Sequence, residues 1–373
     1  MILRTLANII ENNLFTGKAI IVLGARQVGK TTMIKSMFQN NEALLWLNAD
    51  ETDIQNLFKD MSSTRFKAIF GNKKIIVVDE AQQIADIGLR LKLITDMLPE
   101  YQLIVTGSSS FELANHLNEP LTGRKWEYNL FPLSFGEMVQ HHGLLEEKRL
   151  LPHRLVYGYY PEIVTRQGDE EKVLRQLSSS YLYKDILRLE QIKKPDNLIK
   201  LLQAIAYQVG SQVSYSELSQ LCGLDAKTVE KYIMVLEQSY IIFRLGSFSR
   251  NLRNELKFSR KIYFYDNGVR NVLISNFAQI ENRLDTGVLW ENFIISERKK
   301  HLHYNMLFPN IWFWRTKQQN EIDYIEERNG KLSAYEFKWN PDSKIRKPIT
   351  FMNAYPEADF KIIHKDNFED FLI

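Results

Sequence analysis

The N-terminal third of the chain carries its hydrophobic residues in short runs of the length of a buried strand. Residues 30–39, "KTTMIKSMFQ", instead have apolar positions at helical spacing. Buried strands that alternate with helices are typical of a parallel sheet, so the pattern predicts an α/β fold. The strand-like runs lie within residues 18–24, 43–50, 73–84 and 101–110, and a fifth follows Arg124.

Residues 213–248 show a different pattern. Ser214 and Glu217 form a capping box that begins a short helix, and Gly223 ends it. Asp225 then caps a second helix, and a strand follows. Helix, turn, helix and strand in this order predict a winged helix-turn-helix. The second helix buries Val229, Tyr232, Ile233 and Leu236, and turns Lys227, Thr228, Glu230, Lys231 and Met234 outward.

A β-hairpin is predicted at residues 320–339, because Asn329-Gly330 is a preferred pair for a two-residue turn. This register pairs Arg328 with Lys331. It then places Asp323 opposite Glu336 and Glu321 opposite Lys338 on one face, and Ile322, Tyr324, Tyr335 and Phe337 on the other. Facing carboxylates repel each other, so a shared proton, a lysine or a divalent cation is expected between them.

Composition narrows the class of protein. A chain of 373 residues is too long for one core, so about two to four domains are expected. The net charge of +3 does not by itself indicate nucleic-acid binding, and any basic surface is local. The single cysteine, Cys222, excludes an internal disulfide and a multi-cysteine zinc site. No apolar run has the length of a membrane span and no signal peptide is present, so we expect a cytoplasmic protein that contacts no membrane.

Residues 23–32, "LGARQVGKTT", fit the pattern G-x-x-x-x-G-K-[ST] and lie between a predicted strand and a predicted helix. Glycines let the backbone N–H groups wrap around phosphate. Lys30 is placed to reach the β- and γ-phosphates of ATP, and the Thr31 hydroxyl to bind Mg²⁺. The predicted ATP-binding residues are Gly24, Ala25, Arg26, Gln27, Val28, Gly29, Lys30, Thr31 and Thr32.

Within residues 73–84, "KKIIVVDEAQQI", a run of four apolar residues is followed by two acids. Asp79 is expected to hold Mg²⁺ through water, opposite Thr31. Glu80 is expected to orient and polarise the water that attacks the γ-phosphate.

Further polar candidates follow at the next two strands. Thr106 and Ser108 are candidate sensors of the γ-phosphate. Arg124 is a candidate arginine finger, within the chain or toward a neighbouring subunit. A solvated arginine on a turn explains it equally well, so the sequence leaves oligomerisation open.

The chain resembles the AAA+ superfamily, in particular prokaryotic ATPases with a nuclease-like C-terminal domain. "GARQVGKTT", "IIVVDEAQ", "VTGSSS", "LTGR" and "FPLSF" carry the resemblance, and it continues in "GYYPEIV", "YLYKDI", "YFYDNGVRN", "LWEN" and "NEIDYI". The implied organisation is a P-loop AAA+ ATPase core at 1–136, a helical lid or linker at 137–200, a winged helix-turn-helix at 201–252 and a small nuclease-like α/β domain at 253–373.

The hairpin region resembles the PD-(D/E)XK nuclease fold. The resemblance implies that Glu291, Asp323 and Glu336 bind Mg²⁺ or Mn²⁺ and that Lys338 assists the attacking water. Arg315 and Lys317 would then hold phosphate. The alternative is an inactive scaffold, in which Lys338 pairs with Glu321 on a solvated face.

Nucleic acid is a candidate partner of the second half of the chain. Basic residues outnumber Glu255 by six to one between Arg244 and Lys261, which suits nonspecific contact with DNA phosphates. The six are Arg244, Arg250, Arg253, Lys257, Arg260 and Lys261. The alternative is a helical module that docks on the ATPase core, with these charges solvated.

These observations predict an Mg²⁺-dependent ATPase whose nucleotide state controls a winged-helix and nuclease-like module that acts on nucleic acid. Two alternatives stay open. One is an ATP-controlled switch that binds a protein partner, with the nuclease-like domain as a scaffold. The other is a DNA-binding regulator with an inert C-terminal domain.

Overall fold

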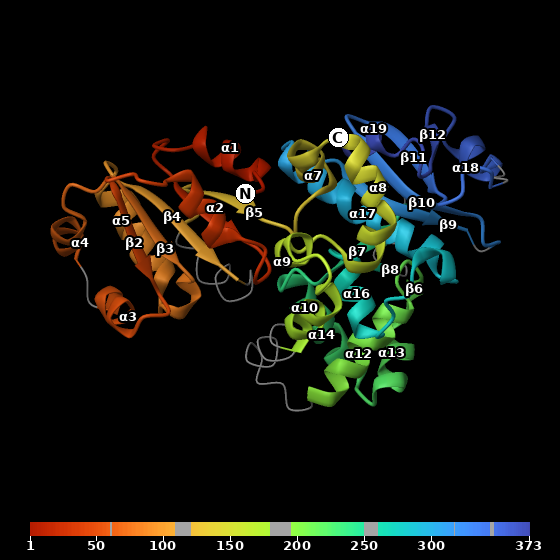
Figure 1. Cartoon of the computed structure of the whole chain (residues 1–373), viewed down its shortest axis with the longest axis horizontal. Coiled ribbons are helices and arrows are strands. Elements are labelled where there is room, and N and C mark those ends of the chain that lie inside the picture. Colours follow the sequence, from red (N-terminus) through yellow and green to blue (C-terminus); the bar gives the residue numbers. More distant parts are fainter. Residues whose placement is uncertain (60–61, 109–120, 180–194, 250–259, 317, 344–346) are drawn as a thin grey trace. The chain divides into compact units, whose positions relative to one another are not determined.

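The computed structural model describes residues 1–59, 62–108, 121–179, 195–249, 260–316, 318–343 and 347–373. The chain divides into two compact units. The first contains Met1–Leu133 and Gln238–Tyr240, and the second contains Ser134–Glu237 and Ile241–Ile373. In Figure 1 the labelled strands β2 to β5 belong to the first unit, and the elements labelled from α7 onward belong to the second. Among the described helices, none is long and apolar enough to cross a membrane.

The first unit is built on a parallel five-stranded sheet, in agreement with the predicted α/β fold. Its strand order is β2-β3-β4-β1-β5. Every residue of β1, β3 and β4 is buried, which explains their continuous apolar sequences. The strands are β1 (Ala19–Leu23), β2 (Leu44–Asn48), β3 (Ile75–Asp79), β4 (Gln102–Gly107) and β5 (Lys125–Asn129).

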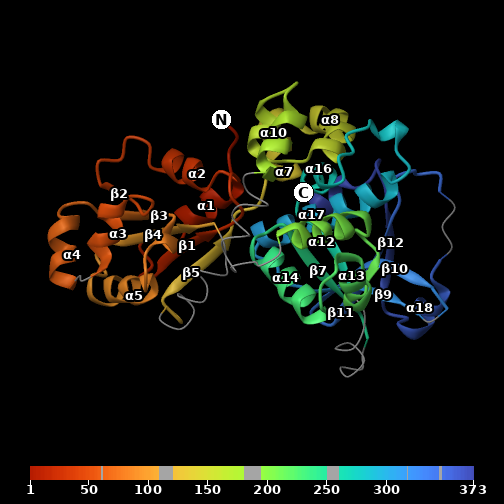
Figure 2. The same cartoon turned by 90° about the horizontal axis from the view of Figure 1, so that it is seen from below.

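Helices cover both faces of this sheet. Figure 2 shows α1 and α2 on one side of it and α5 on the other. Because all five strands are parallel, their carboxyl ends share one edge, where α2 follows β1 and η1 follows β3. The helical elements are α1 (Thr5–Glu11), α2 (Lys30–Met37), α3 (Thr52–Lys59), α4 (Ser63–Phe70), η1 (Ala81–Gln83) and α5 (Ile87–Met97).

The second unit combines helices with a mixed sheet of order β12-β11-β10-β9-β7-β8-β6. Its strands are β6 (Gln212–Val213), β7 (Ile242–Ser247), β8 (Arg260–Phe264), β9 (Asn310–Arg315), β10 (Glu321–Arg328), β11 (Lys331–Phe337) and β12 (Asp359–Ile363). Its helices are α7 (Phe135–His142), α8 (Leu144–Tyr157), α9 (Pro161–Thr165), α10 (Glu170–Leu177), α12 (Pro195–Tyr207), α13 (Tyr215–Cys222), α14 (Ala226–Gln238), α16 (Asn267–Leu273), η3 (Ile280–Asn282), α17 (Thr286–Tyr304), α18 (Ile349–Ala354) and α19 (Glu369–Leu372).

The helix boundaries predicted between residues 213 and 248 are present. The Ser214 hydroxyl accepts from Glu217 N at 3.4 Å, and Gly223 ends α13 with φ 64°. Asp225 Oδ1 accepts from Thr228 N at 2.9 Å at the start of α14. The strands β7 and β8 that follow belong to the same sheet as the hairpin, because Gly246 of β7 pairs with Trp312 of β9. One sheet therefore spans the two domains predicted at 201–252 and 253–373.

The predicted hairpin register is confirmed from Arg328–Lys331 to Tyr324–Tyr335. A β-bulge between Ile322 and Ile325 then changes the alternation along β10. Ile322 joins the core cluster that contains Ile325, whereas the Tyr324 ring packs 6.2 Å from that of Phe371 on the other face. The prediction that Ile322 and Tyr324 share a face is therefore wrong. The extra residue in β10 reverses the face to which the side chains before the bulge point.

Candidate functional site

The loop between β1 and α2 has the backbone conformation that a phosphate-binding loop requires. Gly24, Gln27 and Gly29 have positive φ angles of 156°, 62° and 94°. A Cβ on Gly24 would lie 2.1 Å from Leu130 O, so only glycine fits beside the end of β5. The loop is consequently held close to the sheet edge, with the start of α2 above it. Within it Ala25 and Val28 are buried, Arg26 is half-buried, and Gln27 and Thr32 are exposed.

Lys30 is folded onto the loop. Its Nζ donates to Gly24 O and Ala25 O, both at 2.9 Å, and the residue is only 5% exposed. Burial lowers the Lys30 pKa to about 8, although Glu80 and Asp79 act in the opposite direction. The ammonium therefore lies within electrostatic reach of both acids at the end of β3, as a P-loop lysine must.

The Asp79 carboxylate is held by two hydroxyl groups. Thr31 Oγ1 donates to Asp79 Oδ2 at 3.0 Å, and Thr106 Oγ1 donates to Asp79 Oδ1. Thr106 Oγ1 also accepts from Glu80 N at 3.0 Å, and Thr106 is fully buried. The Thr106 hydroxyl therefore acts both as a donor and as an acceptor to groups of the protein, which favours a positioning role over contact with a γ-phosphate.

Glu80 follows in a left-handed conformation, with φ 54° and ψ 43°. Its Oε2 accepts from Gln82 Nε2 at 2.5 Å, and the same amide donates to Ser108 Oγ at 3.0 Å. Gln82 thus joins the predicted base to the predicted sensor Ser108. The sequence reasoning missed Gln82. Its position three residues after Asp79, close to the predicted base, was the signal that could have indicated a role in the site.

Arg124 lies at the opposite edge of the sheet. Its carbonyl accepts from Ala19 N at the first residue of β1, whereas the P-loop follows the last residue, Leu23. Five strand residues at about 3.3 Å rise separate these edges by roughly 13 Å. The side chain pairs with Asp96 at 2.5 Å. These contacts place Arg124 away from the P-loop of its own chain, and its role as an arginine finger stays a prediction.

A second residue that the sequence reasoning missed is Arg4. It is buried and donates to Val28 O and to Phe131 O, both at 2.6 Å. It therefore fixes the P-loop to the segment after β5. A lone arginine before a short helix gave no sequence signal of this contact.

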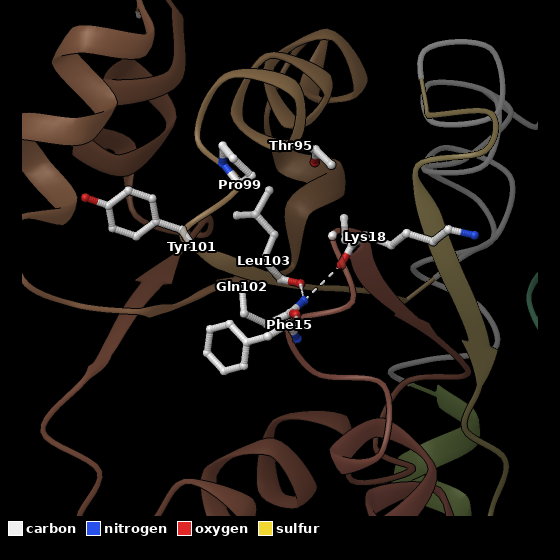
Figure 3. Close-up of a pocket in the computed structure, with 9 residues that line it drawn as sticks. Phe15, Lys18, Thr95, Pro99, Tyr101, Gln102 and Leu103 are labelled. Atoms are coloured by element: carbon white, nitrogen blue, oxygen red, sulfur yellow. Dashed lines mark hydrogen bonds between the residues drawn. The ribbon is translucent and has the colours of Figure 1, made fainter.

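The hollow drawn in Figure 3 is separate from these residues. It is lined by Phe15, Lys18, Thr95 and Tyr101 among others, at the amino ends of β1 and β4. The Gln102 amide spans it and donates to Lys18 O at 3.1 Å. The polar groups there bind the backbone, so this hollow adds no chemistry to the nucleotide site.

The second unit holds an ionic cluster of lysines and carboxylates. Lys261 Nζ lies 3.1 Å from Glu291 Oε1 and 2.6 Å from Glu321 Oε1, and this lysine is 2% exposed. Tyr263 donates to the same Glu291 oxygen at 2.7 Å. Burial disfavours the ammonium, but Glu291, Asp323 and Glu321 outweigh it and raise the Lys261 pKa above its ordinary value. Lys261 was predicted to contact DNA phosphates, with a solvated side chain as the alternative, and it is a buried ion-pair partner instead.

Asp323, Glu336 and Lys338 are close to this cluster. Asp323 Oδ2 accepts from Phe337 N at 2.8 Å, and Lys338 Nζ lies 2.7 Å from Glu336 Oε1. Burial and the Glu291 charge raise the Asp323 pKa to about 7, and burial and Asp323 raise that of Glu336. The structure therefore brings the predicted acids together. Within the described residues, however, no three His, Cys, Asp or Glu side chains are arranged to hold a metal ion.

Several residues that were predicted to contact phosphate or DNA are bound to other groups of the protein. Arg315 lies 3.6 Å from Glu321. Arg244 pairs with Glu237, and Arg244 and Arg260 both donate to the Tyr215 hydroxyl, at 3.0 and 3.1 Å. Lys317, Arg250, Arg253 and Lys257 lie outside the described residues. The three described members of the basic segment are Arg244, Arg260 and Lys261, and all three bind groups of the protein itself.

Comparison with known proteins divides the chain into three matched parts. Residues 16–139 match the family described as an AAA domain. Residues 148–280 and 286–370 match two families described as domains of unknown function, DUF8612 and DUF4143.

Relatives that match along most of this chain are distant in sequence. Uncharacterized proteins of Mycobacterium tuberculosis, Haemophilus influenzae and Methanocaldococcus jannaschii are 25%, 26% and 22% identical over 325, 301 and 383 residues. The alignments cover 86%, 73% and 96% of this chain and 70%, 73% and 82% of the relatives.

A solved structure shares the fold. The Walker-type ATPase of Pyrococcus abyssi superimposes with a TM-score of 0.52 at 17% identity, over 72% of this chain and 94% of that one. Taken with the loop geometry, the family match identifies residues 16–139 as an AAA-type P-loop ATPase domain.

Proposed function

We propose that the chain is an Mg²⁺-dependent ATPase in which Lys30 binds the β- and γ-phosphates, Thr31 and Asp79 hold the metal, and Glu80 activates the attacking water. The observation that carries this proposal is the 3.0 Å hydrogen bond between Thr31 Oγ1 and Asp79 Oδ2, beside the buried ammonium of Lys30. It joins the loop after β1 to the acidic end of β3, which is the pairing that ATP with a divalent cation requires.

The side chains present fit both ATP and Mg²⁺. Lys30 Nζ rests on two carbonyl oxygens, which phosphate oxygens would replace as acceptors. The Thr31 hydroxyl and the Asp79 carboxylate are hard oxygen ligands of the kind Mg²⁺ prefers. When bound, Mg²⁺ neutralises charge on the phosphates. Glu80 accepts a proton from water, while Thr106 keeps the backbone of Glu80 fixed relative to Asp79.

Nucleotide binding and phosphate release in variants of α2 test this proposal. Lys30→Met and Thr31→Ala should lower the rate of ATP hydrolysis at least about tenfold, because each removes a group that contacts phosphate or metal. Ser36→Ala is the matched control, since the Ser36 hydroxyl donates to Met33 O in the same helix. Absence of ATP binding by the wild-type protein, or unchanged hydrolysis in Lys30→Met, would overturn the assignment.

We further propose that nucleotide state controls the second unit and that α14 contacts DNA phosphates. The supporting observation is the exposure of Lys227, Glu230, Lys231 and Met234 opposite the buried face of α14. The contribution of Arg244, Arg260 and Lys261 is small, because these residues already have partners.

Fluorescence anisotropy with duplex DNA at several salt concentrations tests this contact. We expect weak binding. The logarithm of the association constant should fall with the logarithm of the salt concentration, with a slope of about 0.9 per phosphate contacted. Lys227→Ala should reduce that slope by about one. If no DNA binds at low salt, the alternative of an ATP-controlled switch for a protein partner takes its place.

A further inference from the structure

Three acids near the hairpin of the second unit lie around a lysine. Lys261 belongs to β8, Glu291 to α17, and Glu321 and Asp323 to β10. In the sheet β8 is separated from β10 by β7 and β9. The Lys261 side chain crosses this interval over the ring of Phe313, with Nζ 5.4 Å from the ring centroid, and reaches Glu321 on the far side.

Each predicted metal ligand already has a protein donor. Glu291 Oε1 accepts from both Lys261 and Tyr263. Asp323 Oδ2 accepts from Phe337 N, and Glu336 Oε1 pairs with Lys338. A divalent cation bound to Glu291 would lie next to the Lys261 ammonium, which is held against the same carboxylate. With Lys261 in place, the residues present therefore do not fit a metal that binds Glu291, Asp323 and Glu336 together.

Charge leads to the same conclusion. The carboxylates of Glu291, Glu321 and Glu336 pair with the cations of Lys261, Lys338 and Arg315, and Asp323 lies within electrostatic reach of Lys261 and Lys338. Lys261 is 2% exposed, so it is confined within contact distance of Glu291 and Glu321. A divalent ion among the same acids would be repelled by this ammonium at short range in a poorly solvated environment.

We propose that the ammonium group of Lys261 occupies the cation position of this carboxylate cluster, so that the second unit holds its acids together without a divalent metal. The C-terminal unit is then a scaffold with a nuclease-like arrangement of acids, and it does not cleave nucleic acid by metal-assisted hydrolysis. This inference is independent of the ATPase assignment, because it concerns residues of the second unit alone.

The test is a titration of nucleotide-free full-length protein with Mn²⁺, followed by electron paramagnetic resonance of the free ion. The protein carries Asp79→Asn, which removes the metal ligand of the first unit. We expect this protein to bind no Mn²⁺ at millimolar concentration. Adding Lys261→Met should create a site whose dissociation constant for Mn²⁺ is at least about tenfold below the highest concentration used, because the variant removes the charge but keeps the length of the side chain. Asp323→Asn should abolish the new site.

Lys299→Met is the matched control, because Lys299 is a half-buried lysine of the same unit whose Nζ lies 5.1 Å from the centroid of the Phe243 ring. It should create no site. Mn²⁺ binding with Lys261 intact that is lost in Asp323→Asn would overturn the proposal. So would a folded Lys261→Met variant that gains no Mn²⁺. Should Lys261→Met fail to fold, as judged by circular dichroism, the titration with Lys261 intact and its Asp323→Asn counterpart decide the question.

Discussion

At the scale of single residues, the acidic end of β3 is held by a small set of hydrogen bonds. Thr106 fixes the Asp79 carboxylate and the Glu80 backbone, and Gln82 holds the Glu80 carboxylate. The Gln82 amide also donates to Ser108 at the end of β4. Two groups assigned to the γ-phosphate region thus share one positioning residue.

We expect Gln82→Ala to lower the ATP turnover rate roughly tenfold to a hundredfold with little change in ATP affinity. The variant frees the Glu80 carboxylate from its fixed orientation, and misplaced catalytic groups lose rate more than binding. Steady-state phosphate release and equilibrium nucleotide binding measure the two quantities. Gln83→Ala is the control, because Gln83 is the exposed next residue of η1. Equal rates in the two variants would remove the positioning role of Gln82.

The lowered Lys30 pKa makes ATP binding depend on pH. In the free protein burial lowers this pKa to about 8, and the bound triphosphate raises it because it stabilises the charged form. Between the two values binding takes up a proton, so ATP affinity falls as pH rises, by up to about tenfold per pH unit above pH 8. Calorimetric titration at about pH 9 in buffers of different ionisation enthalpy measures this uptake. An affinity that is constant from about pH 7 to about pH 9 would contradict it.

At the scale of elements, the P-loop depends on close contact with the end of β5. Leu130 N donates to Leu23 O at 2.7 Å, and Gly24 passes directly against the Leu130 carbonyl. Arg4 adds hydrogen bonds to Val28 O and Phe131 O across the same region. The loop geometry is therefore imposed by segments that are far apart in sequence.

Gly24→Ala should destabilise the first unit by about 1–3 kcal/mol from steric overlap, in addition to the cost of its positive φ. Gly17→Ala is the control, because Gly17 also has a positive φ but has no atom within 4 Å of the added Cβ. Urea denaturation followed by circular dichroism gives both free energies of unfolding. Similar values for the two variants would show that the contact with Leu130 is not restrictive.

At the scale of the whole molecule, the chain is two compact units, each with its own sheet. The nucleotide residues lie in the first unit, and the ionic cluster around Lys261 lies in the second. The predicted boundaries at 200/201 and 252/253 both fall inside the second unit. They stay predictions about modules within it.

Saturating ATP with Mg²⁺ should raise the unfolding transition of the first unit in differential scanning calorimetry. At a nucleotide concentration of about 100 times the dissociation constant, the first unit gains about 2.7 kcal/mol. The transition of the second unit should move less than that of the first, and Lys30→Met should remove both shifts. A single transition that moves as a whole would show that the two units unfold together.

Local sequence determined much of this protein. The apolar runs that precede "GARQVGKTT" and "DE" specified strands of the parallel sheet, and the glycine pattern specified the loop. Both signals act within a few residues of the chain. The pair Asn329-Gly330 specified the hairpin register as far as Tyr324, because turn chemistry fixes the nearest rungs. The capping residues Ser214 and Asp225 likewise set helix starts through contacts three residues away.

Tertiary structure alone decided the rest. The bulge in β10 reversed the alternation before Tyr324, since it depends on pairing with β9. Arg124 lies at the amino edge because β5 runs parallel to β1, and Lys261 became a buried counter-ion because its side chain on β8 meets Glu291 of α17 and Glu321 of β10. Each of these outcomes depends on contacts between segments distant in the chain, and no short-range pattern encodes such contacts.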